Sequence, residues 1–222
     1  ADKDQSYFLF ELTRAQLAAA TFPLGAMTKL EVRELARRAG LVVAEKSESM
    51  EVCFVASGVR EFVEGQIAEH PGRYGETPSS SPAEVRNSEG EKLGKGDPYY
   101  RYTVGQRRGL GVASSKRLYV LEVLPSENAV VVGDEAELMA PGLAGERLHW
   151  IGEAPTRPLE VTVKIRSRHP GVAALVRPQA GDPEGRVEID FAEPQRGVTP
   201  GQAAVFYQGT QVLGGCWITG RL

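Results

Sequence analysis

The sequence predicts an α+β protein built from several units, with helices near its start and an antiparallel β-barrel or sandwich at its end. Helical periodicity is confined to the first third of the chain. Seven β-rich runs, separated by turn residues such as Pro170-Gly171 and Pro200-Gly201, fill residues 119–222. Many short strands at this spacing are typical of a closed or two-layered sheet. We therefore expect three units, over residues 1–57, 58–118 and 119–222.

Two helix starts are marked by capping boxes in residues 1–57. Thr13 and Thr28 each stand three residues before a Gln or a Glu, a spacing at which both side chains satisfy free backbone N–H groups. They predict a short helix and a longer one that Gly40 ends. An extended piece over residues 41–44 then leads to the polar run before Cys53. The longer helix has one apolar stripe, made by Val32, Leu35, Ala36 and Ala39.

Residues 58–118 predict a small unit with one helix and short strands. Helical spacing runs from Val59 to Ile67, and Asn87-Ser88-Glu89-Gly90 predicts a turn between two strands. Alternating aromatic residues at 99–102 predict a further strand. The unit closes with Gly105-Gln106-Arg107-Arg108-Gly109-Leu110-Gly111, where three glycines let the backbone approach a neighbour closely. The spacing differs from that of a Walker-type phosphate loop.

Charge is distributed unevenly along the chain. The net charge of −3 and the pI of about 5.8 do not indicate a nucleic-acid-binding protein. Residues 101–117, however, hold five Lys or Arg and no acid, and residues 147–177 hold six against two acids. Local basic patches are what a phosphate backbone requires. Ordinary solvated strand faces would have the same composition, so both interpretations stay open.

The two cysteines differ in their surroundings. Cys216 lies in an apolar strand and is expected in the core, whereas Cys53 lies among charged and polar residues. A reactive thiol needs access and a lowered pKa, although a small buried side chain would also fit Cys53. Their wide separation suits a reducing cytoplasm. No metal-binding spacing, long apolar run or signal peptide occurs, and because the chain lacks an initiator Met we expect a fragment.

Six segments follow one another in the order of a known family. Together they resemble the bacterial tRNA-specific 2-thiouridylases, and the resemblance covers nearly the whole chain. The segments are Lys3-Asp4-Gln5-Ser6-Tyr7-Phe8-Leu9, Phe22-Pro23-Leu24-Gly25, Lys29-Leu30-Glu31-Val32-Arg33-Glu34-Leu35-Ala36, Glu51-Val52-Cys53-Phe54, Tyr102-Thr103-Val104-Gly105-Gln106-Arg107-Arg108-Gly109-Leu110-Gly111 and Thr199-Pro200-Gly201-Gln202-Ala203-Ala204-Val205-Phe206-Tyr207.

This resemblance implies the layout of the three units. Residues 1–57 would be the helical tail of an adenine-nucleotide α-hydrolase (PP-loop) domain, 58–118 a small central α+β domain, and 119–222 a tRNA-binding antiparallel β-barrel resembling a translation-factor barrel. The family's pyrophosphate loop, Ser-Gly-Gly-Val-Asp-Ser-Ser, and its first catalytic cysteine are not among the 222 residues. We therefore expect ATP with Mg²⁺ to serve the full-length enzyme, with neither a cofactor site nor a metal site in this chain.

The resemblance also implies a reaction, ATP-dependent 2-thiolation of the wobble uridine, U34, in the anticodon loop of tRNA. Cys53 would carry sulfur as a persulfide received from a protein persulfide donor, and the chain alone would be inactive. An alternative is a non-catalytic tRNA-binding module that uses the basic barrel and the Gly-rich loop. The positions that match the family's tRNA contacts are Lys3, Asp4, Gln5, Arg166, Ser167 and Gln202.

Overall fold

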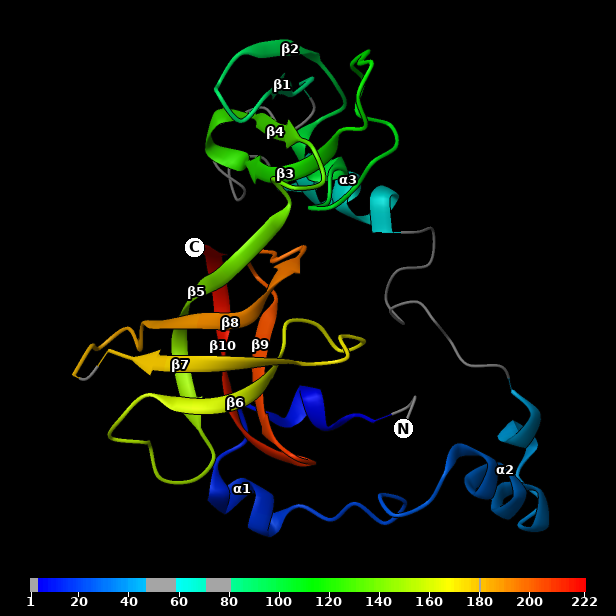
Figure 1. The fold of residues 1–222 in the computed structure, drawn as a ribbon. Helices are drawn as coiled ribbons and strands as arrows, with labels where there is room; N and C mark the ends of the chain where they lie inside the picture. Colours follow the sequence, from blue (N-terminus) through cyan, green and yellow to red (C-terminus); the bar gives the residue numbers. More distant parts are fainter. Residues whose placement is uncertain (1–3, 47–58, 71–80, 180) are drawn as a thin grey trace.

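The computed structural model describes residues 4–46, 59–70, 81–179 and 181–222 of the chain. It contains a closed six-stranded barrel and a separate four-stranded sheet, with short helices in the N-terminal part (Figure 1). All strand pairs of the barrel are antiparallel. The predicted α+β fold with a C-terminal antiparallel barrel is therefore confirmed. Within the described residues, no helix is both long and apolar enough to cross a membrane.

The helices begin where the capping boxes predict. The N-terminal elements are η1 (Ser6–Leu9), α1 (Arg14–Ala19), α2 (Lys29–Arg38), η2 (Val42–Glu45) and, further on, α3 (Val59–Glu69). Thr13 and Thr28 accept hydrogen bonds from backbone N–H groups three residues later, so both caps are confirmed. The extended piece predicted over 41–44 is wrong, because this segment turns into η2. An ion pair between Arg37 and Glu45, 2.5 Å long, holds that turn beside α2.

The smaller sheet has the strand order β2-β1-β4-β3. Its strands are β1 (Glu84–Arg86), β2 (Lys92–Lys95), β3 (Tyr119–Leu124) and β4 (Ala129–Gly133), with η4 (Pro125–Glu127) between the last two. The turn predicted at 87–90 joins β1 to β2, as expected. The strand predicted at 99–102 is wrong, because residues Tyr99–Arg101 form the 3₁₀ helix η3. The Tyr102 side chain instead turns into the core of the sheet.

Strands β3 and β4, which we expected in the barrel, belong to this smaller sheet. β4 pairs in parallel with β1 and antiparallel with β3, and neither β3 nor β4 pairs with a barrel strand. Their valines bury a core of their own with Val85, which explains the choice of partner. The boundary between the two β-structures therefore falls between Gly133 and Met139, rather than at residue 118.

The barrel closes in the order β10-β5-β8-β7-β6-β9. Its strands are β5 (Met139–Trp150), β6 (Leu159–Lys164), β7 (Val172–Pro178), β8 (Val187–Arg196), β9 (Ala203–Gln208) and β10 (Gln211–Arg221). Side chains such as Leu143, Val163, Ile189 and Phe206 fill the interior. Cys216 is fully buried among them, which confirms its predicted place in the core.

Contacts from the barrel to the smaller sheet centre on Arg196. Its guanidinium lies 4.8 Å from the centre of the Tyr119 ring and 3.0 Å from a carboxylate oxygen of Glu135. Arg221, at the end of β10, donates a hydrogen bond to the carbonyl oxygen of Glu137. These contacts join the barrel to strand β3 and to the segment between β4 and β5.

Candidate functional site

The N-terminal segment packs on the outer surface of the barrel. Tyr7 and Phe10 are almost fully buried against β9 and β10, where they pack with Val205 and Trp217. The Tyr7 hydroxyl donates a hydrogen bond of 2.8 Å to the carbonyl oxygen of Ala203. Burial of these two aromatic side chains is favourable because it removes a large apolar area from water. It fixes the exposed residues beside them, Asp4 and Gln5, on the barrel surface.

Asp4 lies close to the end of strand β6. One of its carboxylate oxygens accepts a hydrogen bond of 2.8 Å from the backbone N–H of Ser6. This bond lowers the pKa of Asp4, and the positive charge of Lys164 lowers it further. Lys164 itself lies over the ring of Tyr207, with 4.8 Å between the ammonium nitrogen and the ring centre. The Gln5 side chain is exposed and makes no hydrogen bond to the described part of the protein.

Two loops beside β6 and β9 carry the other predicted contact residues. Arg166 and Ser167 lie in the β6–β7 loop, Gln202 lies in the β8–β9 loop, and all three are exposed. The backbone of Gln202 is fixed by the hydrogen bond that its carbonyl oxygen accepts from Ile218 N–H at 2.8 Å. The Arg166 guanidinium lies against Gly197, since a Cβ atom added there would be 3.4 Å from it. The two loops are therefore neighbours.

His169 fastens the β6–β7 loop to the end of strand β8. It is only 5% exposed, and its Nδ1 accepts a hydrogen bond from Gly171 N–H at 3.1 Å. The proton of the neutral ring is then on Nε2, which donates to the side-chain oxygen of Gln195 at 3.1 Å. Burial lowers the pKa of His169, so the ring stays neutral and the arrangement is kept. Sequence reasoning missed this residue, because a single histidine in a loop gives no signal of burial.

The structure thus places five of the predicted contact residues on exposed positions of one segment and two loops around β6 and β9. They are Asp4, Gln5, Arg166, Ser167 and Gln202. Lys3 and Cys53 lie outside the described residues.

The structure shows which basic residues of the two basic stretches are paired with a carboxylate and which are not. Arg101, Arg147 and Arg177 each have a carboxylate partner, at 2.5, 3.3 and 2.6 Å. Lys164, Arg166 and Arg168, by contrast, form no salt bridge with any residue of the described ranges. Three cations without a carboxylate partner among the described residues therefore lie at and beside the β6–β7 loop.

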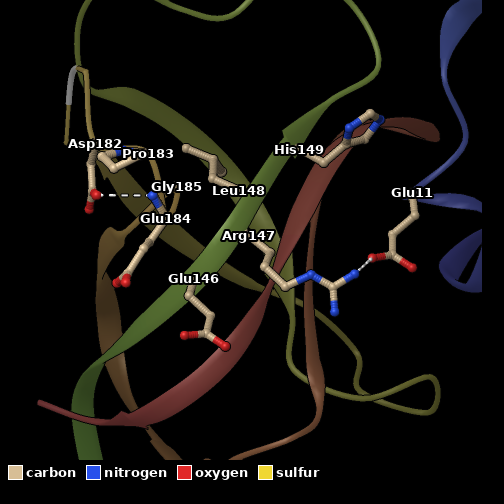
Figure 2. A pocket seen from close by; sticks show the side chains of 9 residues that line it. All are labelled: Glu11, Glu146, Arg147, Leu148, His149, Asp182, Pro183, Glu184 and Gly185. Carbon is tan, nitrogen blue, oxygen red and sulfur yellow. Dashed lines mark hydrogen bonds and ion pairs between the residues drawn. The ribbon is translucent and has the colours of Figure 1, made fainter.

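A hollow of about 650 Å³ elsewhere on the barrel has the opposite character. Figure 2 shows its carboxylates around Arg147, which pairs with Glu11. The lining residues are Glu11, Glu146, Arg147, Leu148, His149, Asp182, Pro183, Glu184 and Gly185. In the part of the chain that the structure describes, no three acidic, His or Cys side chains are placed to hold a metal ion. Four carboxylates would repel phosphates, so this side of the barrel is unsuited to nucleic acid.

The backbone at Arg147 is unusual and has a local cause. Its φ angle of 53° lies in the left-handed region, which non-glycine residues seldom adopt. There the N–H groups of Arg147 and Leu148 donate to the carbonyl oxygens of Glu184 and Gly185, at 2.8 and 3.0 Å. The bend directs the Arg147 side chain toward Glu11 and Trp217, so it helps to hold the N-terminal segment in place.

Comparison with known proteins covers the chain in three consecutive parts. Residues 1–57 match the family model of a tRNA methyl transferase HUP domain, 60–134 that of a tRNA methyl transferase PRC-barrel domain, and 141–218 that of an aminomethyltransferase β-barrel domain. The last two ranges agree with the boundary between the small sheet and the barrel.

Similar full-length proteins share one name. The chain is 49% identical to the tRNA-specific 2-thiouridylase MnmA of Geobacter metallireducens, over 97% of the chain and 56% of that relative. It is 45% identical to the protein of the same name from Solibacter usitatus, over 97% of the chain and 58% of the relative. For that of Geotalea uraniireducens the identity is 46%, over 97% and 55%. The chain thus spans somewhat more than half the length of these relatives.

Proposed function

Because the chain belongs to the tRNA-specific 2-thiouridylase family, we propose that it serves ATP-dependent sulfur transfer to C2 of the wobble uridine, U34, of tRNA in the cytoplasm. Identity of 49% over 97% of the chain to a named member of the family is the observation that carries this proposal. The cations around the β6–β7 loop that form no salt bridge with a described residue support it, because RNA binding requires positive charge that is not already neutralised. Of these, Arg166 and Arg168 are exposed.

The residues around β6 and β9 fit the recognition of an anticodon loop. Gln5 and Gln202 present free amides, which can both donate to and accept from the edges of unstacked bases. Arg166 supplies a guanidinium for a phosphate, with Ser167 beside it. The ionised Asp4 can accept a hydrogen bond from a base or a ribose hydroxyl. A base must leave the stack before its C2 can react, so contacts that hold the loop open are needed.

Cys53 is the proposed carrier of sulfur. Its thiolate takes the outer sulfur of a protein persulfide donor, releases the donor's thiol and becomes a persulfide. The terminal sulfur then attacks C2 of the adenylated uridine, and the C2 oxygen leaves with AMP. A second cysteine thiol then attacks the inner sulfur of Cys53 and releases the transferred sulfur on the uridine. The two cysteines are thereby oxidised to a disulfide, which balances the reduction of the transferred sulfur. Cys216 cannot be that second thiol, because it is buried within the barrel.

The ATP site is not assigned to any residue of this chain. The pyrophosphate-loop sequence typical of the PP-loop fold does not occur in the 222 residues, and no described cluster could hold a magnesium ion. Among the described residues, therefore, no set of side chains fits ATP with Mg²⁺. We infer that these 222 residues bind tRNA and accept sulfur, but do not complete a turnover by themselves.

The proposal is tested by following sulfur to Cys53. Incubation with a cysteine desulfurase and L-cysteine should add the mass of one sulfur atom to the peptide that contains Cys53, and not to the peptide of Cys216. In cells that depend on this gene for 2-thiouridine, Cys53→Ser should abolish the modified base, whereas the matched variant Cys216→Ala should retain it. Persisting 2-thiouridine in the Cys53→Ser strain would refute the role. Binding of tRNA without sulfur at Cys53 would favour the non-catalytic binding module.

A further inference from the structure

A second basic surface lies beside the Gly-rich loop of residues 105–111. An open hollow of about 600 Å³ is formed there by Arg107 together with residues 109–118. Three cations line it, Arg107, Lys116 and Arg117, and no carboxylate does. All three are exposed, and none forms a salt bridge with a described residue. The hollow is thus the electrostatic opposite of the acidic one in Figure 2.

The backbone around the hollow is held in one conformation. Gly109 and Gly111 have φ angles of +71° and +74°, which only glycine adopts without strain. A Cβ atom on Gly111 would lie 2.8 Å from the Cα of Gly96, so the two chains touch at this point. The buried Tyr102 hydroxyl accepts a hydrogen bond from Asp97 N–H at 2.8 Å and donates to the Leu110 carbonyl oxygen at 3.3 Å. Gly109 and Gly111 therefore allow a tightly packed loop whose conformation is fixed by hydrogen bonds.

The Gln106 side chain closes the same loop from the other side. Its oxygen accepts a hydrogen bond from Thr103 N–H at 3.1 Å, and its nitrogen donates to the Arg108 carbonyl oxygen at 2.8 Å. Both polar atoms of the Gln106 side chain are thus bonded within the loop, whereas the exposed Arg107 remains available to bind a ligand. Ser114 Oγ accepts from Lys116 N–H at 3.1 Å, which leaves the Ser114 hydroxyl hydrogen free to donate.

We propose that this hollow binds the sugar–phosphate backbone of RNA, as a second anchoring site apart from the loops around β6 and β9. Arginine forks, an ammonium group and a free hydroxyl are donors that match phosphate oxygens. The glycines keep side chains out of the way of a close approach by the ligand. An acidic protein would match the charge as well, but protein interfaces also use exposed apolar anchors. The larger apolar side chains of this lining, Leu110, Val112 and Leu118, instead pack against the core of the smaller sheet. The inference rests on the proposed function, since it assumes that RNA is the partner.

The salt dependence of tRNA binding tests this site. The triple variant Arg107→Gln/Lys116→Gln/Arg117→Gln should weaken binding at least about tenfold at low salt and reduce the slope of log K against log salt by about two, because each lost phosphate contact removes about 0.7–0.9 from it. The matched control is Arg14→Gln/Lys46→Gln/Arg157→Gln, which removes the same charges from exposed positions elsewhere. It should leave the slope nearly unchanged. Equal slopes for the two triple variants would overturn the proposal.

A measurement on the unaltered protein guards against a folding defect in the variant. A short single-stranded RNA should shift the backbone amide NMR signals of Gly109 and Gly111. Shifts caused by poly-glutamate and not by RNA would assign the hollow to an acidic protein and refute the RNA site. Sulfur loading of Cys53 reports on the proposed function independently. A protein that accepts sulfur and binds tRNA, yet shows no effect of the hollow variant, would contradict only this inference, whereas absence of any tRNA binding would contradict both.

Discussion

The Tyr7 hydroxyl donates a hydrogen bond of 2.8 Å to the carbonyl oxygen of Ala203, the residue that follows Gln202. The bond joins a segment near the start of the chain to the first residue of β9. Burial raises the pKa of Tyr7 to about 12, so the hydroxyl keeps its proton at physiological pH. Asp4 and Gln5 on one side and Gln202 on the other owe their common surface to this contact.

Tyr7→Phe should therefore lower both stability and tRNA affinity. The buried Ala203 carbonyl would lose its donor, which costs about 1 kcal/mol in the free energy of unfolding. Urea denaturation measures this loss, and a binding titration with tRNA measures the accompanying drop in affinity. Tyr100→Phe removes the same atom from a half-buried ring whose hydroxyl has no hydrogen-bond partner among the described residues, so it is the control. Equal stabilities of the two variants would show that the Tyr7 bond contributes nothing.

Glu11 makes a second connection between the N-terminal segment and the barrel. Its Oε1 accepts a hydrogen bond of 2.8 Å from the indole N–H of Trp217 and lies 3.3 Å from the Arg147 guanidinium. Glu11→Ala removes both contacts and should lower the thermal midpoint, by an amount that corresponds to about 1 kcal/mol. Glu11→Gln keeps an acceptor for Trp217 and should lose less. Trp217 fluorescence reports on the contact directly, and no spectral change in Glu11→Ala would contradict the arrangement.

The helix starts of this protein could be predicted from sequence more reliably than the pairing between its strands. Thr13 and Thr28 cap helices because their hydrogen bonds are made within four residues, and such contacts leave a local sequence pattern. β3 and β4 are valine-rich like barrel strands, and nothing local distinguishes a partner in one sheet from a partner in the other. The sequence therefore predicted the strands correctly and assigned them to the wrong sheet.

Strand β5 escaped prediction for a different reason. It contains Pro141, Gly142 and Gly145, residues that are depleted in strands. A Cβ atom on Gly145 would lie 2.5 Å from the sulfur of Cys216, so close packing inside the barrel requires glycine there. For the candidate site, the proposed contact residues come from the family resemblance. The docking by Tyr7, the buried His169 and the pairing of the arginines depend on distant contacts that no spacing in the sequence reveals.

The loops around Arg166 should loosen in mild acid because of His169. Its folded-state pKa lies below the ordinary value of 6.5, chiefly through burial, so the folded state favours the neutral ring. The unfolded chain then binds more protons between these two pKa values, and stability must fall as the pH drops below about 6.5 toward the lowered pKa. Above that range the contribution is complete. Comparing the free energy of unfolding of the parent and of His169→Gln, from about pH 7.5 to about pH 5, should show a difference that shrinks on acidification. A difference independent of pH would rule out the neutral buried ring.

The two cysteines should differ sharply in reactivity. Burial raises the pKa of the Cys216 thiol to about 12, and the side chain is 0% exposed. At about pH 8 it is neither ionised nor accessible, so a thiol reagent should label it only after unfolding. Cys53, as the proposed sulfur carrier, should account for the single thiol that reacts in the native protein. Mass spectrometry of the labelled peptides decides between them, with Cys53→Ser expected to lose the native label and Cys216→Ala expected to keep it. Native labelling of Cys216 would mean that the barrel opens in solution, and it would also remove the physical reason for assigning the sulfur to Cys53 alone.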